Sequence, residues 1–145
     1  MELVDLDLGD PRWQQALPVL QELRPALTLP VLQDVLREGR AQGLRFLGAF
    51  DQGRCLGVAG YRVIANTSAV RKLYVDDLVT TSTERSTGVG TALLRELETR
   101  ARAAGCRVLD LDSGVQRHDA HRFYLRERMR ISSHHFTKQL STSGS

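Results

Sequence analysis

The stretch Arg85-Ser86-Thr87-Gly88-Val89-Gly90 joins a strand-like run, residues 73–80, to a long amphipathic helix that begins at once. A glycine-spaced turn that opens a helix gathers several free backbone N–H groups at the positive end of the helix dipole. Such a turn suits a phosphate or pyrophosphate group. We therefore expect this stretch to bind a phosphorylated small molecule.

The spacing of the glycines limits the nucleotide that this turn can hold. The chain lacks the Gly-x-x-x-x-Gly-Lys-Ser/Thr string of a Walker loop. A dinucleotide fingerprint follows its strand directly and needs a third glycine where this chain has Leu93. Asp110 and Asp112 do lie where a ribose-binding acid would be expected. Dinucleotide binding therefore stays as the less favoured alternative.

The amino-acid composition limits the kinds of protein that this chain can be. The 145 residues predict one domain, 1–140, with a polar tail at 141–145, and 41% hydrophobic and 26% charged residues are typical of a globular protein. No apolar run is long enough for a membrane span. The net charge is +3, but arginines alternate with acidic residues, so nucleic acid is not an expected partner. Cys55 and Cys106 match no metal spacing, and no secretory signal is evident, so we expect a reduced, cytoplasmic protein.

The apolar pattern predicts the order of secondary-structure elements. Pro18 is expected to shorten, kink or delay the first helix. Thr28 or a neighbour is expected to start the second, with Pro30 in its first turn. The predicted strands are 3–8, 44–50, 54–64, 73–80, 107–112 and 129–140, and the predicted helices are 13–23, 28 to 39 or 43, 88–104 and 117–126. The order β-α-α-β-β-β-α-β-α-β predicts an α/β fold with a mixed sheet and helices on both faces.

Two motifs and this element order resemble one family. The pattern Arg/Gln-x-x-Gly-x-Gly/Ala, placed after a strand and opening a helix, is similar to the acyl-CoA motif of the GCN5-related N-acetyltransferases (GNAT). The string Ala120-His121-Arg122-Phe123-Tyr124 resembles that family's Ala-x-x-Phe-Tyr segment on its penultimate helix. Residues 117–126, with 135–138 after them, resemble the aminoalkylphosphonate N-acetyltransferases within the family. The resemblance covers nearly the whole chain and implies the GNAT fold.

The chain departs from the family pattern at three places. Arg117 stands where the family often has Asn, seven residues before the Tyr. Arg128-Met129 stands where Gly-Phe is usual after the helix, and Ser82 replaces the usual Pro of the loop. None of these changes removes a group that acetyl transfer requires, but they weaken the transfer of substrate-side roles from the family.

The resemblance implies transfer of an acetyl group from acetyl-CoA to an amine, by direct attack in a ternary complex. Tyr124 would protonate the departing sulfur, and Asp77 would accept the amine proton, directly or through water. A backbone N–H of the strand would polarise the thioester. The implied cofactor-binding positions are Leu78, Val79 and Thr80 for the pantetheine arm, Arg85, Ser86, Thr87, Gly88, Val89 and Gly90 for the pyrophosphate, and Arg117.

Several readings of these residues stay open at this point. Tyr124 could be a packing aromatic, and solvent could replace Asp77 as the base. Asp76 and Asp77 are expected on opposite faces of their strand, so that one is solvated. His118 and His121 have no evident third ligand, so no metal site is expected.

The acceptor is also open. We expect a small-molecule amine, with an aminoalkylphosphonate or a similar anionic amine as the candidate, contacting residues 24–32 and the final strand. A protein N-terminus is the alternative acceptor. A non-catalytic acyl-CoA-binding or sensing domain is the alternative function, and a homodimer is a further open expectation.

Overall fold

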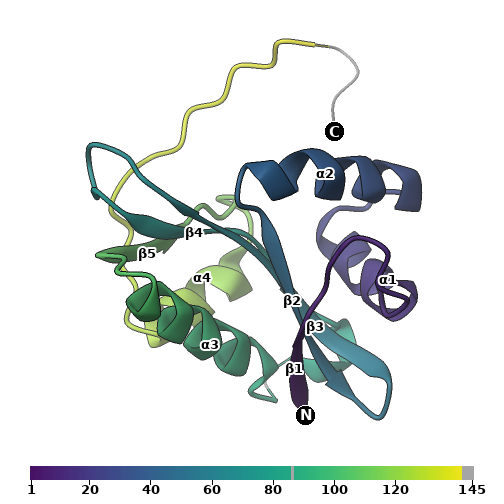
Figure 1. Cartoon of the computed structure of the whole chain (residues 1–145). Helices are drawn as coiled ribbons and strands as arrows, with labels where there is room; N and C mark the ends of the chain where they lie inside the picture. Colours follow the sequence, from purple (N-terminus) through teal and green to yellow (C-terminus); the bar gives the residue numbers. More distant parts are fainter. Residues whose placement is uncertain (86, 142–145) are drawn as a thin grey trace. The chain divides into compact units, whose positions relative to one another are not determined.

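The computed structural model describes residues 1–85 and 87–141 in two compact units, Met1–Leu111 and the chain from Asp112 onward. The first unit contains β1 (Glu2–Asp5), α1 (Trp13–Leu23), α2 (Leu29–Ala41), β2 (Arg45–Asp51), β3 (Arg54–Ile64), β4 (Lys72–Thr80), the 3-10 turn η1 (Ser82–Glu84), α3 (Val89–Ala103) and β5 (Val108–Leu111) (Figure 1). The second contains α4 (His118–Arg126). Ser86 and the end of the predicted tail, 142–145, lie outside the described residues.

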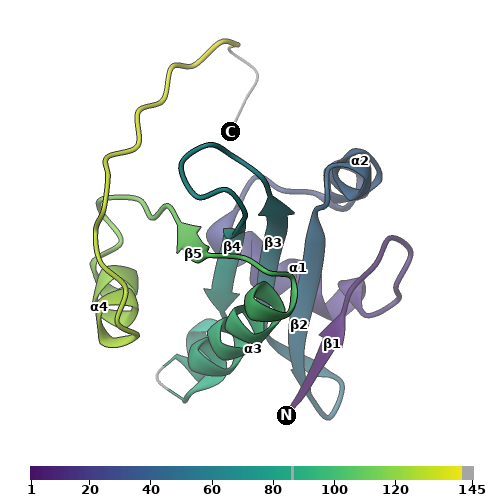
Figure 2. The same ribbon diagram turned by 60° about the vertical axis from the view of Figure 1, so that its left-hand side comes forward.

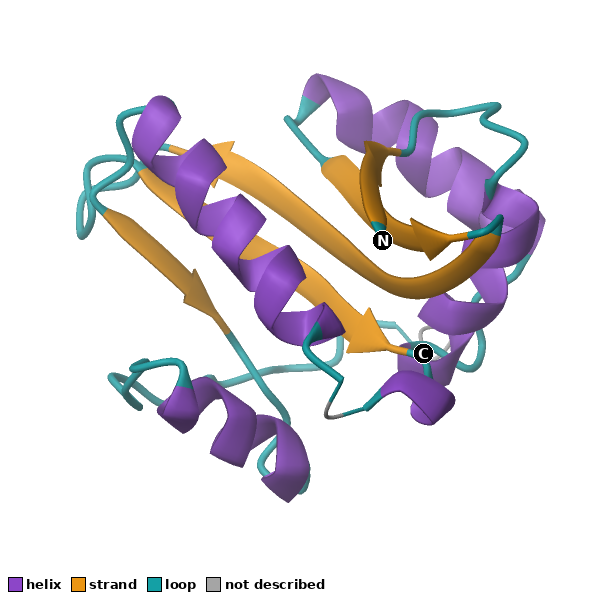
Figure 3. Ribbon diagram, turned by 90° about the horizontal axis from the view of Figure 1, so that it is seen from below, coloured by secondary structure: helices purple, strands orange, loops and turns teal. Residues whose placement is uncertain are grey.

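The first unit is built on one mixed sheet with the strand order β1-β2-β3-β4-β5 (Figure 2). Neighbouring strands are antiparallel except β4 and β5, which run parallel and are joined through α3. Helices α1 and α2 cover one face of the sheet and α3 covers the other (Figure 3). The predicted α/β class, with helices on both faces of a mixed sheet, is therefore confirmed.

Local signals explain how the first two helices begin and continue. Thr28 caps α2 as predicted, with its Oγ1 accepting a hydrogen bond from the Val31 N–H at 3.4 Å. Helix α1 runs without a break through Pro18. Proline costs this helix one backbone hydrogen bond. The buried side chains Ala16, Val19 and Leu20 hold the helix on the sheet in spite of that loss.

The core has two layers, one on each face of the sheet. On one face, Trp13 of α1 packs edge-on against Phe46 of β2, with ring centroids 5.3 Å apart. On the other face, α3 buries Val89, Leu93, Leu94, Leu97 and Ala101. A Cβ at Gly57 would lie 2.9 Å from Leu93 and 3.0 Å from Val89, so glycine lets the start of α3 pack closely on β3.

The predicted final strand, 129–140, is not formed. Residues 129–141 have no regular structure, and every residue from 130 to 141 is exposed. Met129 and Ile131 lie at odd positions whereas Phe136 and Leu140 lie at even positions, so an extended chain offers no apolar face that runs along its whole length. The first strand, Glu2–Asp5, is also shorter than predicted, although the Leu6 N–H still donates to the Phe46 carbonyl of β2 at 3.0 Å and the Leu6 side chain is buried in the core.

The second unit centres on α4, which ends in a Schellman motif. The Met129 N–H donates to the Tyr124 carbonyl at 3.0 Å, and the Arg128 N–H donates to the Leu125 carbonyl at 3.1 Å. Arg128 therefore has φ +66°, a conformation that glycine adopts at no steric cost. This is the position where the family pattern has Gly. No helix in residues 1–85 and 87–141 combines the length and apolar composition that crossing a membrane requires.

Candidate active site

The turn after β4 delivers free backbone N–H groups at the start of α3. Gly88 precedes the helix with φ +93°, and nothing lies within 4 Å of a Cβ built on it, so the backbone angle is what requires glycine. The first hydrogen bond within the helix joins the Ala92 N–H to the Gly88 carbonyl at 3.0 Å. The N–H groups of Val89, Gly90 and Thr91 therefore have no partner within the helix. No side chain among residues 1–85 and 87–141 caps this end. The predicted anion-binding geometry is present in the described part of the turn.

The loop before that turn is held from two sides. The Ser82 N–H donates to Glu22 Oε1 of α1 at 3.0 Å, and Arg54 of β3 forms an ion pair with Glu84. The Thr87 Oγ1 donates to the Glu84 carbonyl at 2.5 Å. Arg85 itself is exposed, and the predicted Ser86 contact lies outside the described residues. The anchored loop therefore presents the helix N-terminus with Arg85 at the surface.

The second half of β4 has one open edge within the sheet. Strand β5 pairs only with Lys72 to Val75, whereas β3 continues along β4 as far as Thr80. The Thr81 N–H donates to the Leu56 carbonyl of β3 at 2.9 Å. Hydrogen-bonding direction alternates along an antiparallel strand, so the polar backbone groups of Val79 point toward β3 and those of Leu78 and Thr80 point away from it. Of the three predicted pantetheine-binding positions, two therefore face the open edge.

A bulge in β4 places Asp76 and Asp77 on the same face of the sheet, contrary to the sequence prediction. Gly60 pairs with Asp77 and Tyr61 pairs with Val75, so Asp76 is an extra residue in the ladder. Because of the extra residue, the side chains of Asp76 and Asp77 do not alternate between the two faces of the sheet. As a result, Asp76 and Asp77 both lie on the face that α1 covers.

Each of these carboxylates is paired with an arginine that sequence analysis did not single out. Asp76 accepts two hydrogen bonds from Arg62 of β3, both at 2.9 Å. Asp77 Oδ1 accepts from Arg24 Nε at 2.9 Å and lies 2.6 Å from Arg24 Nη2, which also donates to the Asp76 carbonyl at 3.1 Å. Arg24 follows the last residue of α1, and no local pattern marks it as a partner of β4.

The environment of Asp77 has opposing effects on its acidity. Burial raises the pKa of Asp77 above its usual range, while the charge and hydrogen bond of Arg24 lower it and the neighbouring Asp76 carboxylate raises it. The net direction is upward. A carboxylate whose pKa is shifted toward neutral pH suits proton acceptance, which keeps Asp77 as a candidate base.

In the second unit, α4 carries both Tyr124 and, just before its first residue, Arg117. Burial raises the pKa of the Tyr124 hydroxyl, and the charge and hydrogen bond of Arg117 lower it. The Phe123 and Tyr124 rings meet at 62° with centroids 5.5 Å apart. Arg117, which was predicted to bind the cofactor, therefore lies next to the hydroxyl of Tyr124, the tyrosine of the family motif.

The histidines make local contacts. The His118 and His121 rings lie 6.1 Å apart, and His121 Nε2 lies 2.8 Å from the Gly114 carbonyl. His135 Nδ1 lies 3.4 Å from Asp112 Oδ1. Among residues 1–85 and 87–141, no group of three or more His, Cys, Asp or Glu side chains is arranged to hold a metal ion.

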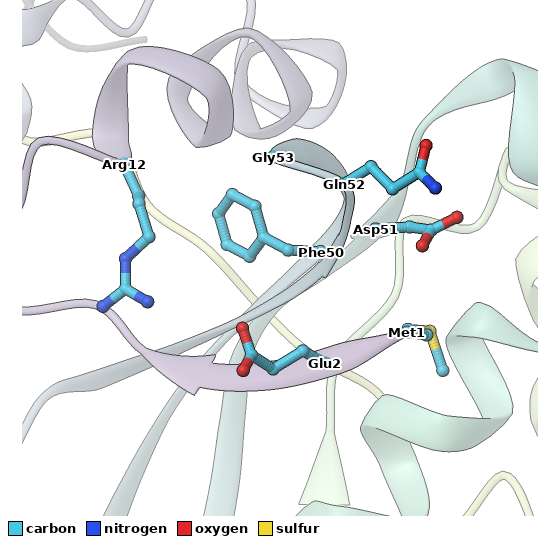
Figure 4. Close-up of a pocket in the computed structure, with 7 residues that line it drawn as sticks. All are labelled: Met1, Glu2, Arg12, Phe50, Asp51, Gln52 and Gly53. Atoms are coloured by element: carbon cyan, nitrogen blue, oxygen red, sulfur yellow. The ribbon is translucent and has the colours of Figure 1, made fainter.

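A separate pocket of 280 Å³ lies at the β2–β3 hairpin and contains none of the predicted site residues (Figure 4). Its lining is Met1, Glu2, Arg12, Phe50, Asp51, Gln52 and Gly53. The Arg12 guanidinium is already bound by Asp10 at 2.7 Å, which leaves little free charge for a ligand. The open β4 edge and the α3 N-terminus are therefore the better candidate site.

Comparison with known proteins identifies the class. Residues 11–128 match the acetyltransferase (GNAT) family model. An uncharacterised N-acetyltransferase, YhdJ, of Bacillus subtilis is 32% identical over 113 residues, 77% of this chain and 80% of the relative. The aminoalkylphosphonate N-acetyltransferase of Salmonella typhimurium is 41% identical over 66 residues, 46% of this chain and 43% of the relative. An aminoglycoside N-acetyltransferase in complex with CoA superposes with a TM-score of 0.81, covering 95% of this chain and 93% of that chain at 12% identity, which supports the fold.

The chain belongs to the GNAT acetyltransferase family, and it is an acyltransferase. The family resemblance read from its two motifs is thereby confirmed.

Proposed function

We propose that this chain is an acetyl-CoA-dependent N-acetyltransferase that acts on a small amine. The observation that carries the proposal is the succession of two features: the open edge of β4 is followed, after η1 and its turn, by the N-terminus of α3, which no described side chain caps. An extended amide-containing arm that ends in a pyrophosphate matches this pair of features. The arm pairs with the strand edge, and the pyrophosphate accepts hydrogen bonds from the helix N-terminus. The unpaired cysteines fit a reducing compartment, so the proposed location is the cytoplasm.

The backbone of β4 and the turn supply most of the cofactor contacts in this proposal. Leu78 and Thr80 exchange hydrogen bonds with the pantetheine amides, and Val79 completes the strand. Gly88, Val89 and Gly90 offer backbone N–H groups to the pyrophosphate, and the proposed site also includes Ser86 and Thr87. Arg85 adds a positive charge at the surface.

The proposed reaction is direct attack of a neutral amine on the thioester carbon. The amine nitrogen forms the C–N bond, the C–S bond breaks, and the sulfur leaves with the bonding pair. Asp77 accepts the proton lost by the amine, and Tyr124 donates a proton to the sulfur. Arg117 beside the Tyr124 hydroxyl stabilises the phenolate that this donation leaves.

The proposed acceptor carries an anionic group. Similarity to the aminoalkylphosphonate N-acetyltransferase is confined to 46% of this chain, so it supports this acceptor only as a candidate. Arg24 and Arg62 on the α1 face of the sheet are already paired with Asp77 and Asp76, so the sequence similarity is what supports the anionic group. A protein N-terminus is the alternative acceptor, and acyl-CoA binding without transfer is the alternative function.

Thiol release from acetyl-CoA tests these proposals. Rates with aminomethylphosphonate, glycine and ethylamine compare an anionic phosphonate, a carboxylate and an uncharged substituent. Preference for the phosphonate by tenfold or more, about 1.4 kcal/mol, supports the anionic acceptor. Equal rates contradict that acceptor and leave acetyl transfer standing, whereas CoA binding with no thiol release from any amine favours the binding domain.

Tyr124→Phe tests the proposed acid. We expect the turnover number to fall by roughly 10²–10⁴-fold, because a positioned general acid contributes about that much. Affinity for acetyl-CoA should change little, since the lost interaction forms mainly in the transition state. Tyr61→Phe is the matched control, because its hydroxyl binds Arg100 of α3 at 2.7 Å. Equal turnover of the two variants would make Tyr124 a packing residue.

A further inference from the structure

Glu84 is an acidic residue in the turn that the proposed function assigns to a pyrophosphate. It is the only acidic residue between Leu78 and Arg95 in the sequence. The positive end of a helix attracts anionic groups from any source. An uncompensated carboxylate beside the N-terminus of α3 would therefore compete with the pyrophosphate and repel it. A residue that neutralises Glu84 would assist the binding of the cofactor.

The carboxylate of Glu84 is held against the last part of the turn. The Glu84 side chain is 20% exposed, and its Oε2 lies 3.4 Å from Thr87 Oγ1. The same hydroxyl donates to the Glu84 carbonyl at 2.5 Å. Thr87 is followed by Gly88, the residue that precedes α3. The charge of Glu84 is therefore fixed close to the backbone N–H groups that are proposed to bind the anion.

Arg54, the first residue of β3, supplies the opposite charge. Its Nη2 donates to Glu84 Oε1, and its Nη1 donates to Thr83 Oγ1 at 3.5 Å. The arginine therefore reaches the turn from a different strand, 30 residues away in the sequence from Glu84. The Arg54 side chain is 59% exposed, and exposed ion pairs contribute little to stability. The position of this pair beside an anion site gives it a role in binding instead.

We propose that Arg54 is a positioning residue for acetyl-CoA, because it neutralises Glu84 and so leaves the N-terminus of α3 available to the pyrophosphate. This inference rests on the proposed function, since it requires a pyrophosphate at the turn. Arg54 acts through Glu84 and does not itself contact the cofactor. The ion pair therefore sets the affinity for acetyl-CoA and takes no part in the transfer of the acetyl group.

Calorimetry with CoA and steady-state kinetics with acetyl-CoA test the proposal in three variants. Arg54→Gln leaves Glu84 uncompensated, so the Kd of CoA and the KM of acetyl-CoA should rise by roughly tenfold at low salt. The kcat at saturating acetyl-CoA should not change, because the lost interaction affects binding and transition state equally. Glu84→Gln removes the charge but keeps an oxygen that Arg54 can bind, so its affinity for CoA should at least equal that of the wild type. The double variant should bind CoA within about twofold of the wild type, because the two changes are coupled.

Two controls separate this role from a general loss of positive charge. Arg37→Gln removes an arginine that is also 59% exposed and is paired with Asp34 of α2, and this variant should leave the Kd of CoA unchanged. Acetyl-pantetheine lacks the pyrophosphate, so its KM should be the same in the wild type and in Arg54→Gln. The difference in Kd between these two proteins should also shrink at about 0.5 M salt, because salt screens the repulsion.

The possible outcomes distinguish this inference from the proposed function. If the wild type binds CoA and Arg54→Gln binds it equally well, this inference alone is overturned. Equal weakening by Glu84→Gln would make the ion pair a structural brace of the turn, and a double variant as weak as Arg54→Gln would make Arg54 a direct ligand of the cofactor. Either result contradicts the proposal. A wild type that binds no CoA would overturn the proposed function, and this inference with it.

Discussion

Removing the charge of Arg24 should shift the proton affinity of Asp77, and we develop this prediction first. Arg24→Gln deletes the guanidinium whose Nη2 lies 2.6 Å from Asp77 Oδ1. Two unit charges about 4 Å apart interact by roughly 4 kcal/mol at an effective dielectric constant of about 20. The Arg24 side chain is 53% exposed, so solvent screening reduces this value to about 1 kcal/mol. That energy corresponds to a rise of about 0.7 unit in the pKa of Asp77.

The direction of the effect on activity follows from the role proposed for Asp77. A base must be ionised to accept the amine proton, so activity is lost as pH falls through its pKa. The acid limb of kcat/KM should therefore move to higher pH by about 0.7 unit in Arg24→Gln. The KM for acetyl-CoA should not change. Arg24→Lys, which keeps the charge but loses the planar two-nitrogen contact, should move the limb less.

Stability should show the same linkage with a definite sign. The pKa of Asp77 is raised in the folded protein, so the favourable contribution of its protonated form is present at low pH and is lost as pH rises through the folded pKa. The variant should accordingly be less stable than the wild type near neutral pH. The difference should shrink as pH falls below the pKa of Asp77, because Arg24 then faces a neutral carboxyl.

The titration of the Asp77 carboxyl carbon, followed by NMR, reads the effect without relying on activity. The charged groups around Asp77 are Arg24 from α1, Asp76 from β4 and, through Asp76, Arg62 from β3. Arg62→Gln is therefore the matched control and should move the midpoint less. Equal midpoints in the wild type and Arg24→Gln would refute the electrostatic reasoning. A shifted midpoint with an unshifted activity limb would refute Asp77 as the base.

Two further predictions concern stability and thiol reactivity. Arg128→Gly should raise the free energy of unfolding of the α4 region by about 1 kcal/mol, measured by amide hydrogen exchange, because Arg128 holds φ +66° at the C′ position of a Schellman motif. Gly105 holds φ +75° at the equivalent position after α3, so Gly105→Arg should lower the free energy of unfolding by a similar amount. A stability change of the opposite sign in either variant would contradict the argument. Burial raises the pKa of the Cys55 thiol to about 11. In the native protein, iodoacetamide should therefore modify the half-buried Cys106 well before Cys55, whereas in urea it should modify both cysteines. Equal modification rates of the two cysteines in the native protein would refute this prediction.

The sequence by itself predicted the order of the helices and strands from β1 to α4 and the turn that begins α3. These features depend on contacts between near neighbours, such as the Thr28 cap and the positive φ of Gly88, which local residue types specify. The family motif likewise pointed to Tyr124. Periodicity also placed the helices on the two faces of the sheet, because a helix buries its apolar stripe.

The tertiary structure alone decided where the charges of the site lie. Arg24 and Asp77 are 53 residues apart in the chain, so no local pattern could pair them. The bulge at Asp76 depends on how β4 aligns with β3, and a shift of one residue moves a side chain to the other face. Residues 129–140 resemble a strand locally, but a strand forms only where a neighbouring backbone completes its hydrogen bonds. Pairing between distant segments is therefore what sequence periodicity could not supply.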